Sequence, residues 1–312
     1  MTATAGGKHP IRTAIDWGEI APLRLRARQV AEGVYAGAHR SSLRGAGIEF
    51  GGYREYVPGD DLRWLDRRSL LRHDRLVVRQ FETETDRTLS LLVDASASMG
   101  YRGEGAPGAK VAFASLLAAA LARVALSGGE PVSLSFLGGA ASAASGRDPL
   151  AVPRGSGRDQ FERIVSSLER IEAGGDALGD PSMLDRAVQS LVRATRRGAI
   201  VVVLSDLLDL PDGAENRIAE MAPSGRVLVV VQTLDPTEVA FPFTGTVRLR
   251  ALEGDAVVET DAAAARDRYL AALGALTQRW REAVVRRGGR FVLASSADAP
   301  VQVVRDIVRA VR

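Results

Sequence analysis

The chain contains no cysteine among its 312 residues. This excludes a disulfide framework, thiol chemistry and a cysteine-ligated metal. A chain of this length buries a sizeable core without such cross-links. At roughly 100–200 residues per domain, the length predicts one large or two ordinary domains. The lack of thiols fits a reducing compartment, so we expect a cytoplasmic protein.

The chain also lacks an apolar run of the ~18 residues needed to cross a bilayer. The longest candidate, Val111–Leu126, begins beside Lys110 and is interrupted by Arg123, which predicts a buried helix. The first residues are mainly Thr, Ala and Gly, without an apolar stretch. We therefore expect neither a signal peptide nor a membrane span.

Lysine is nearly absent. Lys8 and Lys110 are the two lysines among 41 basic residues, so 39 are arginines, and 38 carboxylates leave a net charge of +3. The pI of about 9.6 therefore reflects the high pKa of arginine more than a charge excess. Residues 20–48 are locally basic, which leaves salt-dependent nucleic-acid binding as an alternative. Because no aromatic ladder accompanies these arginines, we interpret them as a solvated surface and expect no nucleic-acid partner.

Sequence patterns divide the chain into three parts. Residues 1–20 are a predicted loose arm, residues 21–85 a predicted N-terminal α+β extension that packs on the main domain, and residues 86–312 the main domain. In the extension, helical spacing of apolar residues and a turn at Pro58–Asp61 set the element boundaries. The predicted elements are a helix at 22–38, a strand at 48–56, a helix at 62–71 and a strand at 76–81.

Beyond residue 86, strands alternate with helices, which predicts an α/β fold with a doubly wound, mostly parallel sheet of the Rossmann type. Continuous apolar runs such as Ala199–Leu204 fit strands that are covered on both faces. A weaker pattern around Gly254-Asp255 predicts a β-hairpin, and 138–158 is a predicted loop. The predicted strands lie at 88–93, 132–136, 199–204, 226–232 and 290–293, and the predicted helices at 110–126, 159–171, 182–195, 214–221, 261–287 and 300–312.

Oxygen-bearing side chains follow several predicted strands, where open α/β sheets bind their ligands. Asp94-Ala95-Ser96-Ala97-Ser98 follows one strand, and Asp206 and Asp235 follow two others. A loop that leaves a strand directs alternate residues to one side, so Asp94, Ser96 and Ser98 can share one cation. Mg²⁺ or Mn²⁺ suits such oxygen ligands. Two hydroxyls leave the ion under-neutralised, so it would attract a carboxylate from a partner protein.

The spacing of Asp94, Ser96 and Ser98 resembles the metal-ion-dependent adhesion site of von Willebrand factor A domains. That pattern also has a threonine from a later loop and an aspartate after a further strand. Asp206 matches the aspartate. Ser182 best matches the threonine, and Asp176 is the rival assignment. The resemblance implies a metal site of Asp94, Ser96, Ser98, Ser182 and Asp206, with the two aspartates as direct or water-mediated ligands.

Three further segments, Gly45–Phe50, Arg54–Arg63 and Arg75–Phe81, resemble the bacterial domain-of-unknown-function family 58. With the metal motif, the resemblance covers the chain from about Leu23 to its end. The family usually has Ile-Asp-Trp where this chain has Leu65-Asp66-Arg67, so we expect the local packing to depart from the family pattern there. The resemblance implies a von Willebrand factor A-like fold. It also implies a role as adaptor or cofactor of a MoxR-type AAA+ ATPase.

Two alternatives assign other chemistry to the same region. Asp94 could act as nucleophile or ligand in a magnesium-dependent phosphohydrolase, but the haloacid-type pattern has a second acid where this chain has Ser96. The domain from residue 86 onward also has no histidine or cysteine to serve as base or nucleophile. Gly103–Lys110 differs from a phosphate-binding loop because Ala109 separates the second glycine from the lysine. We therefore predict a non-catalytic, metal-dependent interaction module.

Overall fold

A computed structural model describes residues 23–37, 50–55, 77–81, 87–139, 151–177, 179–223, 225–253 and 256–311. The predicted arm at 1–20, the predicted helix at 62–71 and the predicted turn residues Gly254-Asp255 lie outside the described residues. Most of the sequence motifs at 45–63 lie outside them as well.

The centre of the molecule is a six-stranded sheet with strand order β10-β7-β6-β3-β4-β5. Five strands are parallel and β5 is antiparallel to β4. This confirms the predicted α/β class and the mostly parallel sheet. The interpretation of 138–158 as loop alone was wrong, because β5 lies in this segment and pairs at the edge. The strands are β3 (Leu89–Ala95), β4 (Val132–Gly138), β5 (Val152–Gly155), β6 (Ile200–Ser205), β7 (Val227–Leu234) and β10 (Arg290–Ser295).

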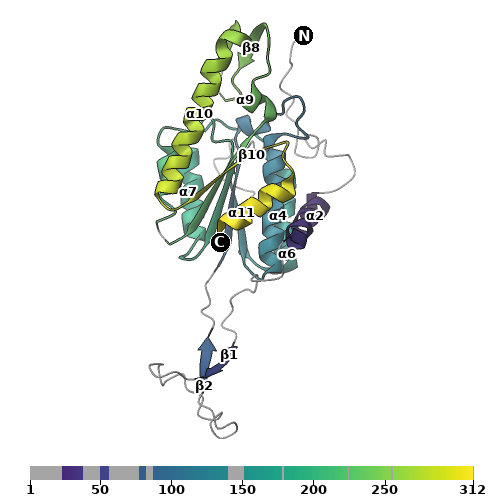
Figure 1. Cartoon of the computed structure of the whole chain (residues 1–312), viewed down its shortest axis with the longest axis vertical. Helices are drawn as coiled ribbons and strands as arrows, with labels where there is room; N and C mark the ends of the chain where they lie inside the picture. The colour runs from purple at the N-terminus through teal and green to yellow at the C-terminus, as the bar shows by residue number, and fades with distance from the viewer. Residues whose placement is uncertain are drawn as a thin grey trace.

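Helices cover both faces of this sheet (Figure 1). Two buried apolar clusters, one on each face, hold them there. The first face carries α2 (Leu23–Gly37), α4 (Lys110–Ser127), α6 (Gly157–Arg170) and α11 (Pro300–Val311). The second face carries α7 (Ser182–Ala194), α8 (Ala214–Ala219) and α10 (Ala262–Arg286).

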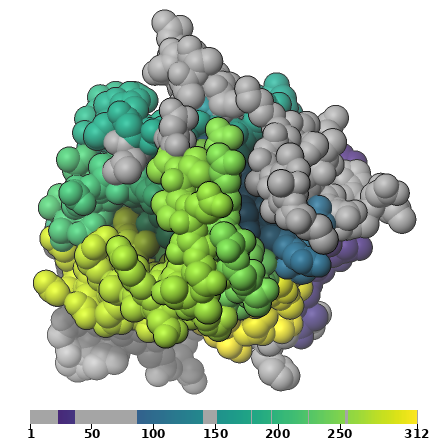
Figure 2. Space-filling view, turned by 90° about the horizontal axis from the view of Figure 1, so that it is seen from above, coloured from purple at the N-terminus to yellow at the C-terminus, as the bar shows by residue number. Residues whose placement is uncertain are grey.

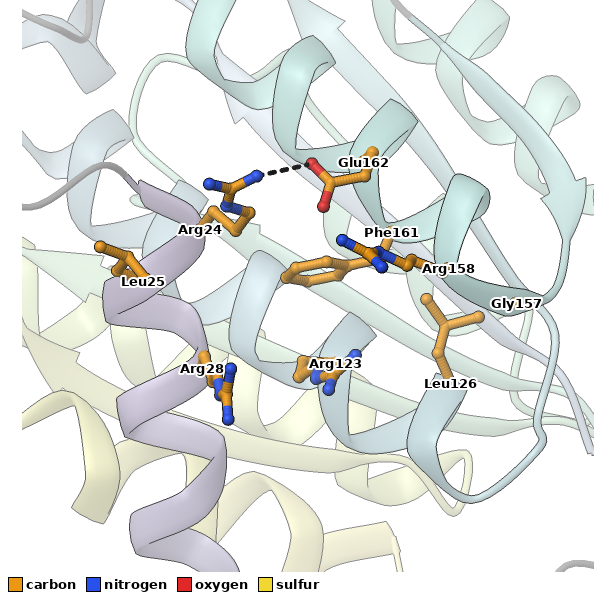
Figure 3. Close-up of a pocket in the computed structure, with 9 residues that line it drawn as sticks. All are labelled: Arg24, Leu25, Arg28, Arg123, Leu126, Gly157, Arg158, Phe161 and Glu162. Carbon is orange, nitrogen blue, oxygen red and sulfur yellow. Dashed lines mark ion pairs between the residues drawn. The ribbon is translucent and has the colours of Figure 1, made fainter.

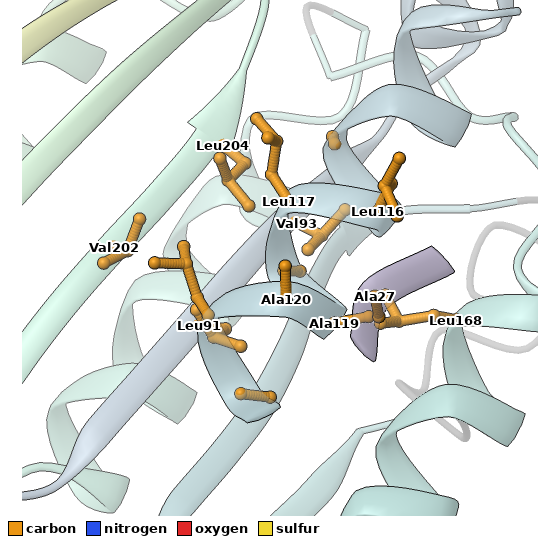
Figure 4. Packing of buried hydrophobic residues seen from close by; sticks show 14 of the residues in the cluster. Ala27, Leu91, Val93, Leu116, Leu117, Ala119, Ala120, Leu168, Val202 and Leu204 are labelled. Atoms are coloured by element: carbon orange, nitrogen blue, oxygen red, sulfur yellow. The ribbon is translucent and has the colours of Figure 1, made fainter. Parts of the chain in front are cut away.

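Alternation along β3 shows why both faces are apolar. Leu91 and Val93 belong to the first cluster, whereas Leu92 belongs to the second, because successive side chains of a strand point to opposite faces. Figure 4 shows Leu91 and Val93 packed beside α4. By length and composition α4 could span a membrane, but it is largely buried in the protein, as expected for a core helix.

Helix α2 packs on the main domain although about fifty residues separate it from β3 in sequence. The Tyr35 hydroxyl donates to the Val124 carbonyl at 3.0 Å, and Arg305 Nη2 donates to the Gly33 carbonyl at 2.7 Å. Between α2 and β3, β1 (Phe50–Glu55) pairs with β2 (Val77–Phe81) in a separate antiparallel sheet.

A second antiparallel hairpin lies near the carboxyl edge of the large sheet. It consists of β8 (Thr246–Arg250) and β9 (Val257–Asp261), which confirms the predicted hairpin. The short helix α9 (Pro236–Ala240) follows β7 at this edge. Figure 2 views this end of the molecule, where the green segment that includes the hairpin lies across the middle of the face.

Candidate functional site

The candidate site lies where β3 and β6 end, side by side, at the carboxyl edge of the sheet. These strands pair in parallel, with Val93 opposite Leu204, so the residues that follow them emerge together. Asp94 is the sixth residue of β3 and Asp206 directly follows β6. The topology therefore brings together the two aspartates that the sequence places 112 positions apart, as predicted from the carboxyl edge that parallel strands share.

The Asp94 carboxylate is buried, with 1% of the residue exposed, and is held by hydrogen bonds at both oxygens. Oδ1 accepts from the Ser96 backbone N–H at 2.8 Å, and Oδ2 accepts from the Ser205 hydroxyl at 2.5 Å. Burial, together with the negative charge of Asp206, raises the pKa of Asp94 to about 7. A nearby cation would stabilise its ionised form.

Ser96 and Ser98 lie on the same side of the loop that follows β3, as the alternating pattern predicted. Their hydroxyl oxygens are 3.2 Å apart, and both residues are buried. The Ser96 and Ser98 side chains also lie close enough to the Glu253 carboxylate, which comes from the segment joining β8 to β9, to affect its pKa. Hydroxyl oxygens of two serines thus lie between two buried carboxylates, those of Asp94 and Glu253.

Asp206 has a fixed positive partner. Lys110 Nζ lies 2.8 Å from Asp206 Oδ2 and 2.5 Å from Glu238 Oε1, and the Lys110 side chain is fully buried. Burial by itself would lower the pKa of Lys110, but the two carboxylates outweigh it and raise the pKa above its ordinary value. The other Asp206 oxygen accepts from the Leu208 backbone N–H at 2.9 Å. Asp206 is therefore held in place by the protein itself, with Lys110 as a positive partner that it shares with Glu238.

The backbone after Asp206 adopts an uncommon conformation. Leu207 has φ of 61° and Asp209 has φ of 49°, the left-handed region that non-glycine residues rarely adopt. The Ser205 hydroxyl accepts from the Leu207 backbone N–H at 2.9 Å while it donates to Asp94. Such strain persists where the surroundings over-determine the conformation, and it is common at binding sites.

The two sequence candidates for the threonine position lie in different surroundings. Ser182 begins α7, is exposed, and bonds to Asp180 and Arg186. Asp176 accepts from the Gly179 backbone N–H at 2.7 Å and lies close enough to Asp209 to affect its pKa. Among the hydrogen bonds of the described residues, none joins Ser182 to the buried group around Asp94.

The loop that contains Asp176 packs directly on the loop after β3. Gly174 N–H donates to the Ala95 carbonyl at 2.8 Å, and Ala97 N–H donates to the Gly175 carbonyl at 3.2 Å. Ala177 N–H donates to Glu253 at 3.0 Å. The segment that approaches the site is thus 174–177, several residues before Ser182.

The donor set fits a hard divalent cation in chemistry. Asp94, Ser96, Ser98 and Glu253 present carboxylate and hydroxyl oxygens to a common region, the ligand types that Mg²⁺ and Mn²⁺ accept. Within the described part of the chain, no three carboxylate or imidazole groups gather as a metal cluster. A cation at this site would therefore depend on the serine hydroxyls.

Sequence reasoning missed Lys110 and Glu253. Lys110 was considered only as part of a phosphate-binding loop, and the structure places it instead in a buried ion pair. A lysine at the first position of an apolar helix, in a chain that otherwise uses arginine, was the available signal. Glu253 carries no local signal, because an isolated glutamate before a turn is ordinary. Its partners are far away in sequence.

A second, basic surface lies on the first face of the sheet. Arg24, Arg28, Arg123 and Arg158 surround Phe161 in a cavity of about 550 Å³ (Figure 3). Arg24 lies 3.6 Å from Glu162, Arg28 pairs with Glu32, and Arg123 lies over the Phe161 ring. Several of these arginines thus have partners within the protein. That nucleic acid does not bind here stays a prediction.

Two solved structures are weakly similar to this chain. BatB from Bacteroides thetaiotaomicron is 14% identical with a TM-score of 0.44, and the match covers 72% of this chain and 98% of that chain. An aerotolerance-related membrane protein from Bacteroides fragilis is 16% identical with the same TM-score and the same coverage. These likenesses concern the fold alone.

A family model identifies the family of this chain. Uncharacterized proteins of Mycobacterium bovis and Mycobacterium tuberculosis are each 29% identical to the chain over 238 residues, which is 76% of this chain and 71% of theirs. Residues 52–279 match the family described as protein of unknown function DUF58. The match confirms the resemblance inferred from the sequence motifs. The chain therefore belongs to the DUF58 family.

Proposed function

We propose that this protein is a non-catalytic, cation-dependent protein-interaction module with a von Willebrand factor A-like main domain. Its binding site is the carboxyl edge around Asp94, Ser96 and Ser98. The cation is Mg²⁺ or Mn²⁺, and the partner is a cytoplasmic protein that presents a carboxylate. The proposed partner is a MoxR-type AAA+ ATPase, and the proposed role is that of its adaptor in the assembly or maturation of a complex.

The observation that carries the proposal is the convergence of oxygens at the end of β3. The Asp94 carboxylate and the hydroxyls of Ser96 and Ser98 lie together, as the Asp-x-Ser-x-Ser spacing requires. When bound, the cation would supply a positive charge that accepts an outside carboxylate. Because Lys110 already pairs with Asp206, we assign Asp206 an indirect role through water or through Asp94. We leave Ser182 outside the ligand set because it already pairs with Asp180 and Arg186.

The geometry supports binding over phosphoryl transfer. Both Asp94 oxygens are engaged by Ser96 and Ser205, an arrangement that fixes a ligand rather than exposes a nucleophile. Lys110 Nζ is fully buried between two carboxylates and does not reach solvent. The phosphohydrolase alternative has a direct test. Turnover of a generic phosphate ester with Mg²⁺, lost in Asp94→Asn, would favour the enzyme.

The central test compares Asp94→Ala with Asp212→Ala, an exposed aspartate beyond the end of β6. We expect calorimetric titration with Mn²⁺ to show binding by the wild type and by Asp212→Ala, and none by Asp94→Ala. In a pull-down with a purified MoxR-type ATPase from the same genome, we expect capture by the wild type. Chelator or Asp94→Ala should abolish it. Capture that persists in both would contradict the proposal.

A further inference from the structure

The hairpin β8–β9 exposes most of its length and buries the side chain next to its tip. Val257 and Val258 are exposed, and the outward faces of both strands meet solvent. Glu253, in contrast, is only 8% exposed. A glutamate is seldom buried unless its carboxylate is compensated. The hairpin therefore directs one acidic side chain into the protein at the candidate site.

The partners of Glu253 come from the two loops that form the site. Oε1 accepts from the Ser98 backbone N–H at 3.3 Å, and Oε2 accepts from the Ala177 backbone N–H at 3.0 Å. The hydroxyls of Ser96 and Ser98 also lie close enough to this carboxylate to affect its pKa. The same hydroxyls are the proposed cation ligands, so Glu253 lies where a further carboxylate would complete the coordination shell.

We infer that Glu253 is an internal ligand of the site, holding the position that a partner's carboxylate takes when the partner binds. This inference rests on the proposed cation-dependent function of the same edge. The partner would present a glutamate or aspartate side chain, and would have to displace the Glu253 side chain to reach the cation. Displacing Glu253 costs free energy, so this internal ligand lowers the affinity of the site for the partner.

A cavity beside the hairpin has room for a partner segment whose carboxylate would replace that of Glu253. A cavity of about 850 Å³ adjoins Ser98 and is lined by Leu249, Leu252 and Val258 of the hairpin segment and by Tyr269 of α10. Its lining is largely apolar with few charged groups. A partner segment that carries an acidic residue beside apolar side chains matches this combination of site and cavity.

The test uses Mn²⁺ alone and acetate as a minimal external carboxylate. We would titrate Mn²⁺ into the wild type, Glu253→Ala and Glu259→Ala, the last being an exposed glutamate of the same hairpin. Removing an internal ligand should weaken Mn²⁺ binding by about tenfold or more in Glu253→Ala. Glu259→Ala should bind like the wild type.

Acetate should restore Mn²⁺ affinity to Glu253→Ala, whereas chloride at equal ionic strength should not. Acetate should have no such effect on the wild type or on Glu259→Ala, whose position is filled by Glu253. Amide hydrogen exchange gives a second measure. We expect faster exchange of the Ser98 and Ala177 amides in Glu253→Ala, because both donate to this carboxylate. If Glu253→Ala folds poorly by circular dichroism, the nearly isosteric Glu253→Gln replaces it in the Mn²⁺ titration, without the acetate arm because its side chain fills the space that acetate would enter.

The outcomes separate this inference from the proposed function. Mn²⁺ binding that is lost in Asp94→Ala but unchanged in Glu253→Ala and Glu253→Gln would overturn the internal ligand and leave the proposed function standing. If acetate changed the Mn²⁺ affinity of all variants alike, the assignment of Glu253 as internal ligand would be overturned as well. A wild-type protein that does not bind Mn²⁺ would overturn the proposed function and this inference with it.

Discussion

Lys110 shows how one side chain changes the electrostatics of the site. Its fully buried ammonium is the positive partner of both the buried Asp206 and the partly buried Glu238. Asp235 helps to position Glu238, because the two form a capping box at the start of α9. Asp235 also accepts from the Gly103 backbone N–H at 2.9 Å. The ion pair and the cap together fix the loop ends next to the proposed cation site.

Replacement of this lysine should be costly to stability. We expect Lys110→Met to lower the free energy of unfolding by about 3–5 kcal/mol, because it leaves the buried carboxylate of Asp206 and the partly buried one of Glu238 without their partner. Arg28→Ala breaks the exposed ion pair with Glu32 and should change stability by no more than ~0.5 kcal/mol. Urea unfolding of both variants measures this. Equal losses of unfolding free energy in the two variants would contradict the expectation that the buried ion pair contributes more to stability than the exposed one.

Ser98 and Ser182 are both cation ligands in the assignment made from sequence, but their hydroxyls have different surroundings in the structure. We expect Ser98→Ala to weaken Mn²⁺ binding by about tenfold, since its hydroxyl lies 3.2 Å from that of Ser96 within the buried group. Ser182→Ala should leave Mn²⁺ affinity unchanged, because its hydroxyl pairs with Asp180 and Arg186. Calorimetric titration of both variants decides between them. A loss in Ser182→Ala would restore the assignment made from sequence.

At the scale of elements, the ends of the strands support the site loop. Gly138 is the last residue of β4, with φ of +75°. A Cβ at this position would meet the Ser96 backbone N at 3.1 Å and the Gly174 carbonyl oxygen at 3.2 Å. The close approach of three backbone segments thus requires glycine. The site loop, β4 and the loop before α7 are packed as one unit.

The matched control for Gly138 is Gly129, which has φ of +83° and no neighbour within 4 Å of an added Cβ. We expect both Gly138→Ala and Gly129→Ala to lose about 1–2 kcal/mol of stability from the left-handed backbone. Only Gly138→Ala should also weaken Mn²⁺ binding, because it displaces Ser96. Thermal unfolding and Mn²⁺ titration measure the two effects. Similar Mn²⁺ affinities in the two variants would contradict the coupling.

At the scale of the whole molecule, α2 completes the core of the main domain, although about fifty residues separate α2 from β3, the first strand of its sheet. Ala27 is fully buried beside α4 and α6 (Figure 4). The small side chain lets the helices approach closely. This packing makes α2 part of the main structure rather than an independent appendage.

Enlarging this contact should undock α2. We expect Ala27→Leu to lower stability by about 1–3 kcal/mol through overpacking. Ala36→Leu makes the same change at an exposed position of α2 and should have little effect. Denaturant unfolding followed by circular dichroism measures both. An Ala27→Leu variant as stable as Ala36→Leu would show that α2 tolerates repacking.

The sequence by itself determined the alternation of strands and helices, and with it the parallel sheet. It also determined the placement of Asp94, Ser96 and Ser98 after one strand and Asp206 after another. These features follow from local periodicity and from the rule that parallel strands share a carboxyl edge. The edge strand β5 escaped prediction because it is only four residues long and lies next to a polar, glycine-rich segment.

Only the tertiary structure decided what surrounds those residues. Lys110 and Asp206 are 96 positions apart, and Ser98 and Glu253 are 155 apart. No local pattern encodes such pairs, because they depend on how the helices and the hairpin close over the sheet edge. The structure thus shows the predicted ligands in their surroundings: Asp206 pairs with the Lys110 ammonium, and the Ser98 backbone N–H donates to the Glu253 carboxylate.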